Sequence, residues 1–282
     1  MAPIKSQVYL NMLPDYHIHT PLCKHAEGDV ASYKAEATKR KIPEICFADH
    51  APSPDGYDPH HRMDISQLRT YRSMITSLQD GHGPGVLFGI EADYYEGCET
   101  FLREWLPEQN FDYVLGSVHF IEKWGFDNPA ERHIWDSVDV TATWRKYFDL
   151  IGRLADSGLF DAASHLDLPK KFGHRPSDND LKEMAKPTLD RIAKADMGIE
   201  LNTSGLKKPA SEIYPSPLIL SLAFERDIPI CFGSDAHGPE QVGNNFDQAL
   251  RLARETGYTR FFKISQRKKE LLSLPETLPP LF

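Results

Sequence analysis

Histidine and carboxylate residues in this sequence gather where short apolar runs end. Seven of the twelve histidines, one glutamate and one aspartate lie at or shortly after such a point. The nine residues are His17, His19, His25, His50, Glu91, His119, His165, Asp235 and His237. Imidazole and carboxylate ligands without thiolate suit Zn²⁺, Mn²⁺ or iron ions. Nine such side chains exceed the needs of one tetrahedral ion, and with one bridging carboxylate they suit two or three ions.

The spacing of these residues supports a shared site. His17 and His19 are two residues apart on an expected strand, so both rings should point to the same face. Asp235 and His237 have the same spacing. A single histidine is more often an ordinary polar residue, but a random scatter would not favour strand ends so strongly. The other five, expected mostly at the surface, are His60, His61, His82, His133 and His174.

The elements that must position these residues alternate between short apolar runs and longer amphipathic stretches, which is typical of βα units. The expected strands are 13–17, 44–48, 86–91, 113–118, 161–165, 198–202 and 229–233. The expected helices are 30–40, 65–79, 99–105, 141–156, 178–194, 217–225 and 239–255. Seven units predict a TIM-like α/β barrel, whose parallel strands end on one rim where active sites are built. A last strand at 259–264 would leave an eighth unit incomplete.

Composition limits the possible functions. The chain of 282 residues, with 40% hydrophobic and 26% charged residues, is typical of a soluble globular protein, and we read 1–282 as one domain. A net charge of -9 argues against nucleic-acid binding, and no apolar run is long enough to cross a membrane. The four cysteines form no C-x-x-C pair, which favours a cytoplasmic setting without disulfides. No glycine-rich phosphate-binding motif follows any expected strand.

Seven segments of the chain resemble a known family. In chain order they are DYHIHTPLCKHAEG (15–28), FADHAP (47–52), GIEADYYEG (89–97), YVLGSVHFI (113–121), ASHLDLPKKFG (163–173), ELNTSGLKKP (200–209) and CFGSDAHGP (231–239). Together they resemble the polymerase and histidinol phosphatase (PHP) superfamily over most of the chain. The segments NTSGLKKP and EIYPSP (212–217) are most similar to its histidinol-phosphate phosphatase branch.

The resemblance implies a distorted (β/α)7 barrel with three divalent ions, Zn, Mn or Fe, at the C-terminal rim of the strands. It implies a first ion held by His17, His19, Glu91 and Asp235. It implies a second ion that shares Glu91 and adds His119 and His165, and a third held by His25, His50 and His237. Every ligand type that the family requires is present. The implied activity is hydrolysis of a small phosphate monoester, with L-histidinol phosphate, an intermediate of histidine biosynthesis, as the expected substrate.

In that reaction Glu91, Asp235 and His237 act through the ions, and Asp49 is either the general acid or a carboxylate that orients a ligand histidine. The phosphate and the cationic leaving group need further polar contacts from the loops at the rim. The candidates for these contacts are Lys170, Lys171, Asn202, Ser204, Lys207, Tyr94 and Glu96. Each of them could equally be an ordinary loop residue.

Other functions remain open from the sequence. The same fold could carry a phosphodiesterase or nucleotide phosphatase, although the acidic chain shows no basic, aromatic-lined channel for a long strand. An amidohydrolase also begins with H-x-H on its first strand, but it needs other ligands after the fourth and sixth strands than His119 and Asn202. A catalytically silent metal-binding module is less compatible with the intact ligand set. The sequence does not indicate the oligomeric state.

Overall fold

The structure, a computed structural model, describes residues 12–278. The chain divides into two compact units, each built from separate segments. As far as they are described, the first unit consists of Met1–Ile90, Phe111–Tyr113 and Cys231–Phe282, and the second of Glu91–Asn110 and Val114–Ile230. The division passes through strands, so each unit contains several consecutive members of one sheet.

Seven strands form the main sheet, in the order β1-β2-β3-β4-β7-β8-β9. They are β1 (Asp15–Ile18), β2 (Glu44–Phe47), β3 (Gly85–Asp93), β4 (Tyr113–Ser117), β7 (Ala162–Ala163), β8 (Gly198–Asn202) and β9 (Ile230–Gly233). The strand pairs β1–β2, β2–β3, β4–β7 and β7–β8 are parallel, and nearly every strand residue is buried. Parallel strands covered on both faces require such apolar sequences. The order and direction are those of the distorted (β/α)7 barrel that the sequence predicts.

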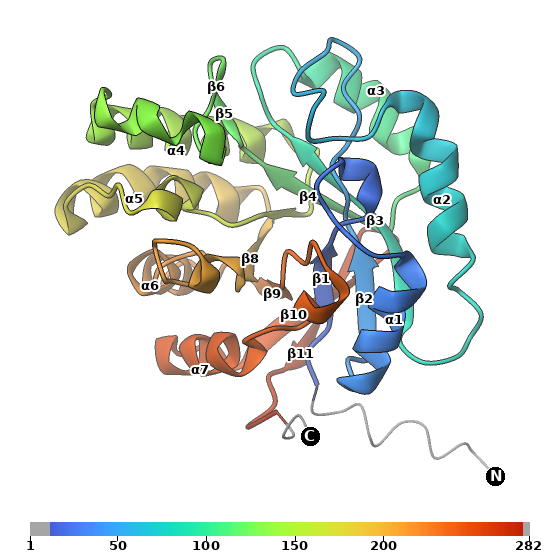
Figure 1. Ribbon diagram of the computed structural model, residues 1–282. Coiled ribbons are helices and arrows are strands. Elements are labelled where there is room, and N and C mark those ends of the chain that lie inside the picture. Colours follow the sequence, from blue (N-terminus) through green and yellow to red (C-terminus); the bar gives the residue numbers. More distant parts are fainter. Residues whose placement is uncertain (1–11, 279–282) are drawn as a thin grey trace. The chain divides into compact units, whose positions relative to one another are not determined.

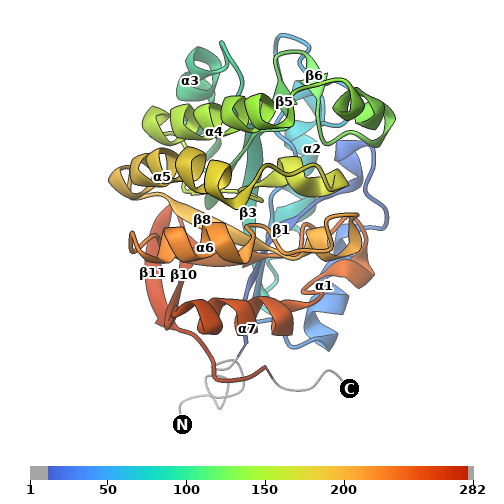
Figure 2. The ribbon, with the colours of Figure 1, turned by 90° about the vertical axis from the view of Figure 1, so that its left-hand side faces the viewer.

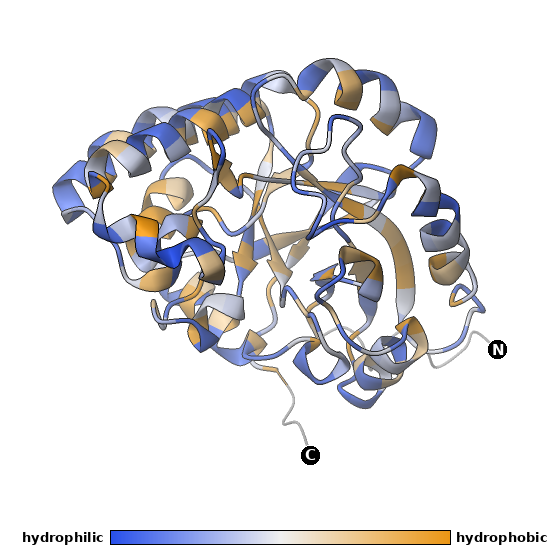
Figure 3. Cartoon of the chain, turned by 45° about the horizontal axis from the view of Figure 1, so that its top comes forward, coloured by the Kyte–Doolittle hydropathy of each residue, from blue (hydrophilic) through white to orange (hydrophobic). Residues whose placement is uncertain are grey.

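Seven α-helices alternate with these strands in the described chain. They are α1 (Val30–Lys39), α2 (Leu68–Thr76), α3 (Glu99–Gln109), α4 (Val140–Ser157), α5 (Asp178–Lys194), α6 (Pro217–Phe224) and α7 (Phe246–Thr256). In the second unit α4, α5 and α6 lie side by side in successive layers (Figure 2). The helices carry hydrophobic and hydrophilic residues on different faces, whereas the strands are mainly hydrophobic (Figure 3). This is the pattern expected when helices cover a buried sheet.

In the first unit, backbone contacts extend past β1 to the loop after β9. Ile18 forms a parallel bridge with Ala236, whose carbonyl accepts a hydrogen bond from the backbone N–H of His19 at 2.9 Å. The carboxylate of Asp15 strengthens this junction, because it accepts hydrogen bonds from the N–H groups of Ser234 and Gly243 at 2.9 and 2.8 Å. The loop after β9 is therefore fixed against the end of β1.

Helix α2 is anchored to the two strands β2 and β3 of the same unit through a buried tyrosine. The Tyr71 hydroxyl lies 2.8 Å from the carbonyl oxygen of Phe47 and 2.9 Å from that of Gly89, and it accepts from the Asp49 N–H at 3.3 Å. No larger residue fits at position 89, because a Cβ at Gly89 would clash with the sulfur of Cys46. Figure 1 shows α1 beside β2 in this unit.

The structure corrects two expected elements. The last strand does not begin an eighth unit, since β10 (Arg260–Ser265) pairs antiparallel with β11 (Lys268–Ser273) as a separate hairpin. The expected helix 239–255 is divided into a 3₁₀ turn, η7 (Pro239–Gln241), and α7. Gly243 and Asn245 between them have positive φ angles of 64° and 60°, which a continuous right-handed helix does not allow.

Short elements between the main ones follow several strands. They are the hairpin β5 (Phe120–Ile121) and β6 (Trp124–Gly125), and the 3₁₀ helices η2 (Pro21–Cys23), η3 (Ile65–Gln67), η4 (Pro129–Asp136), η5 (Leu168–Phe172) and η6 (Ser204–Lys207). All four cysteines are buried and unpaired with one another, as their spacing predicts. Among the described residues, no helix is both long enough and apolar enough to span a membrane.

Candidate metal centre

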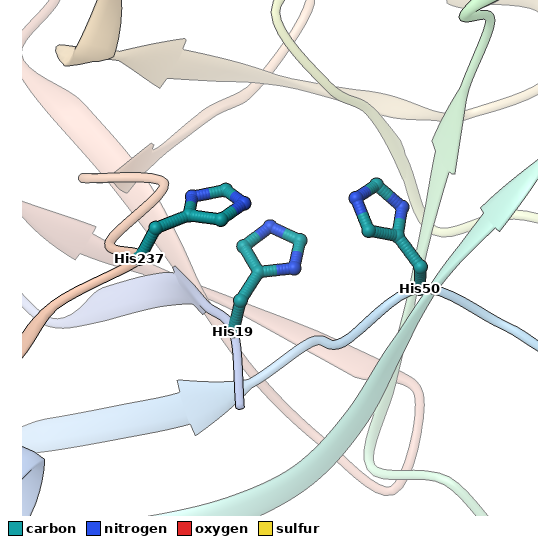
Figure 4. A group of neighbouring side chains, drawn as sticks. All are labelled: His19, His50 and His237. Atoms are coloured by element: carbon teal, nitrogen blue, oxygen red, sulfur yellow. The ribbon is translucent and has the colours of Figure 1, made fainter. Parts of the chain in front are cut away.

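Six of the nine predicted ligands lie together in the first unit and form what we call the first cluster: His17, His19, His25, His50, Asp235 and His237. His19 follows β1 directly, His50 follows β2, and Asp235 and His237 follow β9. Three of these rings, from His19, His50 and His237, turn toward a common space from three separate segments (Figure 4). Each offers a ring nitrogen within 4.8 Å of the others, a spacing that suits ligands of one metal ion.

Ring nitrogens in the first cluster face one another directly. The Nε2 atoms of His17 and His19 are 3.0 Å apart, and those of His25 and His237 are 2.9 Å apart. The Asp235 Oδ1 atom lies 3.1 Å from His19 Nε2. When both rings of such a pair are neutral, each ring has one unprotonated nitrogen that can bind a cation. These imidazole and carboxylate donors therefore fit a divalent cation.

Burial and neighbouring charges shift the pKa values of several residues in the first cluster. Burial alone would lower the pKa of His19, but hydrogen bonds to Asp235 and Asp49 raise it to about 9. Burial opposes ionisation of Asp235, yet the neighbouring imidazoles of His17, His19 and His237 hold the pKa of its carboxyl well below the usual range. Burial also lowers the pKa of His25 and of His237. The carboxylate Asp235 is therefore ionised and ready to bind a cation.

Asp49 lies at the edge of the first cluster and is completely buried. Its Oδ1 atom accepts from the backbone N–H of His50 at 2.8 Å and lies 3.4 Å from His19 Nδ1. Its Oδ2 atom accepts from the N–H and the hydroxyl of Thr20. These contacts match one of the two alternatives that the sequence left open, a carboxylate that orients a ligand histidine.

The other three predicted ligands lie together in the second unit and form the second cluster: Glu91, His119 and His165. Glu91 is in β3, and the two histidines follow β4 and β7. The Glu91 Oε1 atom lies 3.1 Å from His165 Nε2 and 3.7 Å from His119 Nε2, and the two ring centroids are 5.0 Å apart. One buried carboxylate thus faces two imidazoles.

Further carboxylates contact the two histidines of this cluster. Asp93 Oδ1 accepts from the Ser117 hydroxyl at 2.8 Å and lies 2.7 Å from His119 Nδ1. Burial would lower the pKa of His119, but the charges of Asp93 and Glu91 raise it to about 10. Glu200 accepts from the backbone N–H of His165 at 3.0 Å. A carboxylate against the ring nitrogen of a histidine, as in the Asp93–His119 contact, is the usual support of metal-ligating histidines.

Two candidate ligands have strained backbone conformations. His165 has a φ angle of 21° and Asp235 one of 54°, values that residues other than glycine rarely adopt. The Glu200 carboxylate stabilises the first of these turns, and the contact of Ala236 with β1 stabilises the second. Strain of this kind persists where surrounding contacts over-determine it, and it concentrates at functional sites.

The predicted substrate contacts have varied surroundings. Lys170 is buried, and its Nζ lies within 3.1 Å of Asp167, Glu212 and the carbonyl of Ile213. Lys171 forms an ion pair with Asp127 at 2.9 Å. In the same region Lys207 is exposed.

The remaining candidates also have partners. The buried Asn202 donates to Glu200 and accepts from the N–H of Ser204. Tyr94 is buried, and its hydroxyl donates to Glu99. Glu96 is 88% exposed and faces Arg153 at 3.9 Å. Asn202 and Ser204 are thus held in one turn, while Tyr94 and Glu96 contact residues of α3 and α4.

Several residues of the site were not predicted from the sequence. Asp93 lies two residues after Glu91 on the same strand, and Glu200 precedes Asn202 by two, so the spacing rule that paired His17 with His19 could have found both. Asp127 follows a hairpin of two-residue strands, and no pattern in the sequence marks it.

Comparison with known proteins gives consistent results. "Probable histidinol-phosphatase" of Deinococcus radiodurans is 41% identical over 247 residues, which is 87% of this chain and 94% of that protein. "Histidinol-phosphatase" of Bacillus subtilis is 28% identical, over 84% of this chain and 97% of its own length.

A solved structure supports the fold. The crystal structure of histidinol phosphate phosphatase from Lactococcus lactis, complexed with zinc, L-histidinol and phosphate, superimposes with a TM-score of 0.81. The match covers 92% of this chain and 98% of that one at 20% identity. A family model described as the PHP domain matches residues 15–204. With the family model and the Deinococcus relative in agreement, this chain belongs to the PHP domain family.

Proposed function

We propose that this protein hydrolyses L-histidinol phosphate to L-histidinol and phosphate at a centre of up to three divalent ions. One observation carries this proposal: all nine predicted ligands fall into two clusters, and in each cluster a carboxylate faces imidazoles. Membership of the PHP domain family, with a relative 41% identical named a probable histidinol-phosphatase, supports the choice of substrate.

The two clusters belong to one centre in this proposal, and residues 1–282 act as one domain. The candidate ligands follow strands that run parallel in one sheet, and in such folds the carboxyl ends of the strands carry the active site. Glu91 would help to hold two ions, the first with His17, His19 and Asp235 and the second with His119 and His165. His25, His50 and His237 would hold the third ion.

Bound divalent ions would polarise the phosphoryl oxygens and provide a hydroxide nucleophile near neutral pH. The protein's own residues prepare that chemistry. Asp49 and Asp93 hold His19 and His119 by their Nδ1 atoms, so each Nε2 faces the cluster. Asp49 has this positioning role rather than that of a general acid, because its two oxygens are already occupied by donors from Thr20 and His50.

Substrate contacts come from the loops that follow β7 and β8. Lys171, Asn202, Ser204 and Lys207 supply polar groups to the phosphate or the pocket wall. Lys170 acts indirectly in this scheme, because its ammonium is held by Asp167 and Glu212 and fixes the turn after His165. The substrate is a small molecule, not a nucleic acid, and the enzyme works in the cytoplasm.

The metal requirement tests the proposal. Purified protein should release phosphate from L-histidinol phosphate, lose that activity after treatment with a chelator, and regain it when Zn²⁺, Mn²⁺ or Fe²⁺ is added. Elemental analysis should find two to three ions per chain in the active form, because nine ligands exceed the needs of one. Full activity in protein with less than one ion per chain would refute the proposed centre. The variant His133→Ala is a suitable control, since His133 is exposed on η4.

A further inference from the structure

An ion pair in the second unit joins the loops that begin at two candidate ligands. Asp127 lies shortly after the β5–β6 hairpin, which follows His119 in the chain, and Lys171 lies in η5, which follows His165. The Lys171 Nζ and Asp127 Oδ2 atoms are 2.9 Å apart, and the side chains are 15% and 20% exposed. The pair therefore links the two loops near the second cluster while remaining partly accessible to solvent.

The hairpin determines where Asp127 lies. Phe120 pairs with Gly125, which reverses the chain shortly after His119. The carbonyl of Phe126 accepts from the indole N–H of Trp135 at 2.7 Å, and its ring packs edge-on against Tyr147 at 5.6 Å. The residue before Asp127 is thus anchored on both its backbone and its side chain. The backbone next to Asp127 is therefore held in place, whereas Lys171 reaches the carboxylate with a long, flexible side chain.

The charged groups near Asp127 suit a carboxylate that binds a cationic group of the substrate. Burial works against its ionisation, but the positive charge of Lys171 lowers the pKa of its carboxyl. The other nearby acids have structural partners: Asp93 holds His119, and Glu200 holds the backbone of His165. Asp127 is paired instead with a lysine, a partner that another ammonium group could replace.

We propose that Asp127 determines specificity by pairing with the ammonium group of the leaving alcohol, in exchange for Lys171. The released Lys171 ammonium then contacts the phosphate of the same substrate. A substrate that carries one cationic and one anionic group thereby replaces one ion pair with two. Asp127 therefore keeps a counter-charge before and after the substrate binds. This inference rests on the proposed function, because L-histidinol phosphate carries both charges.

The variant Asp127→Asn tests the exchange, with Glu122→Gln as its matched control. Glu122 belongs to the same hairpin and also pairs with a lysine, Lys146, at 2.6 Å, but its side chain is 74% exposed. Two substrates separate the roles: L-histidinol phosphate carries the ammonium group, and p-nitrophenyl phosphate does not. Inhibition by L-histidinol and by inorganic phosphate measures the two halves of the site independently of turnover.

Asp127→Asn should raise KM for L-histidinol phosphate and the inhibition constant of L-histidinol by about 10-fold or more, the loss expected for a charged hydrogen bond. KM for p-nitrophenyl phosphate and the inhibition constant of phosphate should not rise, since Lys171 stays available. Glu122→Gln should change none of these values by more than about twofold.

Equal increases on both substrates, or no increase on either, would overturn the role of Asp127. A failure of the proposed function would look different, because the unaltered protein would then show no preference for L-histidinol phosphate. In that case 3-aminopropyl phosphate and propyl phosphate still test Asp127. A preference for the first that Asp127→Asn removes would support ammonium recognition, and an identical preference in both proteins would refute it. Unchanged thermal unfolding of Asp127→Asn would exclude a folding defect as the cause.

Discussion

At the scale of single residues, one arrangement recurs in both clusters: a buried carboxylate behind an imidazole. Asp49 lies behind His19, and Asp93 lies behind His119. The grouping of the candidate ligands could be predicted, because imidazoles rarely concentrate at strand ends unless they share a site. Asp127 was harder to predict, since its position depends on a hairpin of two-residue strands whose sequence has no periodic pattern.

Asp49→Asn should behave as the loss of a positioning residue. An amide cannot accept all the hydrogen bonds that Thr20 and His50 donate to the carboxylate, so His19 should lose its orientation. Metal affinity should fall by about 10–100-fold, and excess metal should restore turnover. The loss should be equal for L-histidinol phosphate and for p-nitrophenyl phosphate, whose leaving group needs no proton. A larger loss on L-histidinol phosphate at full metal occupancy would instead assign Asp49 as the general acid.

Metal binding should release protons at pH 8. In the metal-free protein the pKa of His19 is raised to about 9 and that of His119 to about 10. Both imidazole rings are therefore in their doubly protonated, positively charged form at this pH. Metal-bound imidazole must be neutral on the coordinating nitrogen, so Zn²⁺ should displace about two protons from these rings. Calorimetry in buffers of different ionisation enthalpy measures that number.

The number of protons released should become smaller as the pH rises toward 10, because the rings are then increasingly deprotonated in the metal-free protein. Asp93→Asn provides the comparison, since without that carboxylate the pKa of His119 should fall and fewer protons should be displaced at pH 8. Zinc binding without proton release from the unaltered protein would contradict the assigned charge states.

At the scale of elements, the apolar runs predicted all seven sheet strands to within about three residues. The errors occurred where tertiary contacts override local pattern. The run 259–264 is as apolar as a barrel strand, but β10 pairs with β11 as a separate hairpin. The amphipathic stretch 239–255 suggests one helix, yet its first turn is interrupted where Asp15 accepts the N–H of Gly243. Neither contact is visible from residue spacing.

Tyr71→Phe tests how far α2 depends on its contact with β2 and β3. Removing the hydroxyl leaves the carbonyls of Phe47 and Gly89 and the N–H of Asp49 without this partner. The free energy of unfolding should fall by about 1–3 kcal/mol, measured by urea denaturation of metal-free protein. Tyr33→Phe removes one hydroxyl contact, to the carbonyl of Glu27, and should cost less. An equal or larger cost for Tyr33→Phe would contradict the central role of Tyr71.

At the scale of the whole molecule, a net charge of -9 coexists with a proposed site for an anionic substrate. The net charge alone does not exclude an anionic substrate, because bound divalent ions would make the site locally positive. The family could be recognised from ligand motifs spread over most of the chain. The substrate could be predicted only through similarity to one branch of that family, since a leaving group is selected by a few loop side chains such as Asp127.

The most direct test of the central claim is the value of kcat/KM for L-histidinol phosphate, compared with a panel of nucleoside monophosphates, a nucleoside bisphosphate and a dinucleotide, all at saturating metal. We predict that L-histidinol phosphate is preferred by at least about 100-fold, or about 2.7 kcal/mol in transition-state binding. A clear preference for the dinucleotide or the bisphosphate would contradict the proposed substrate while leaving membership of the PHP domain family intact.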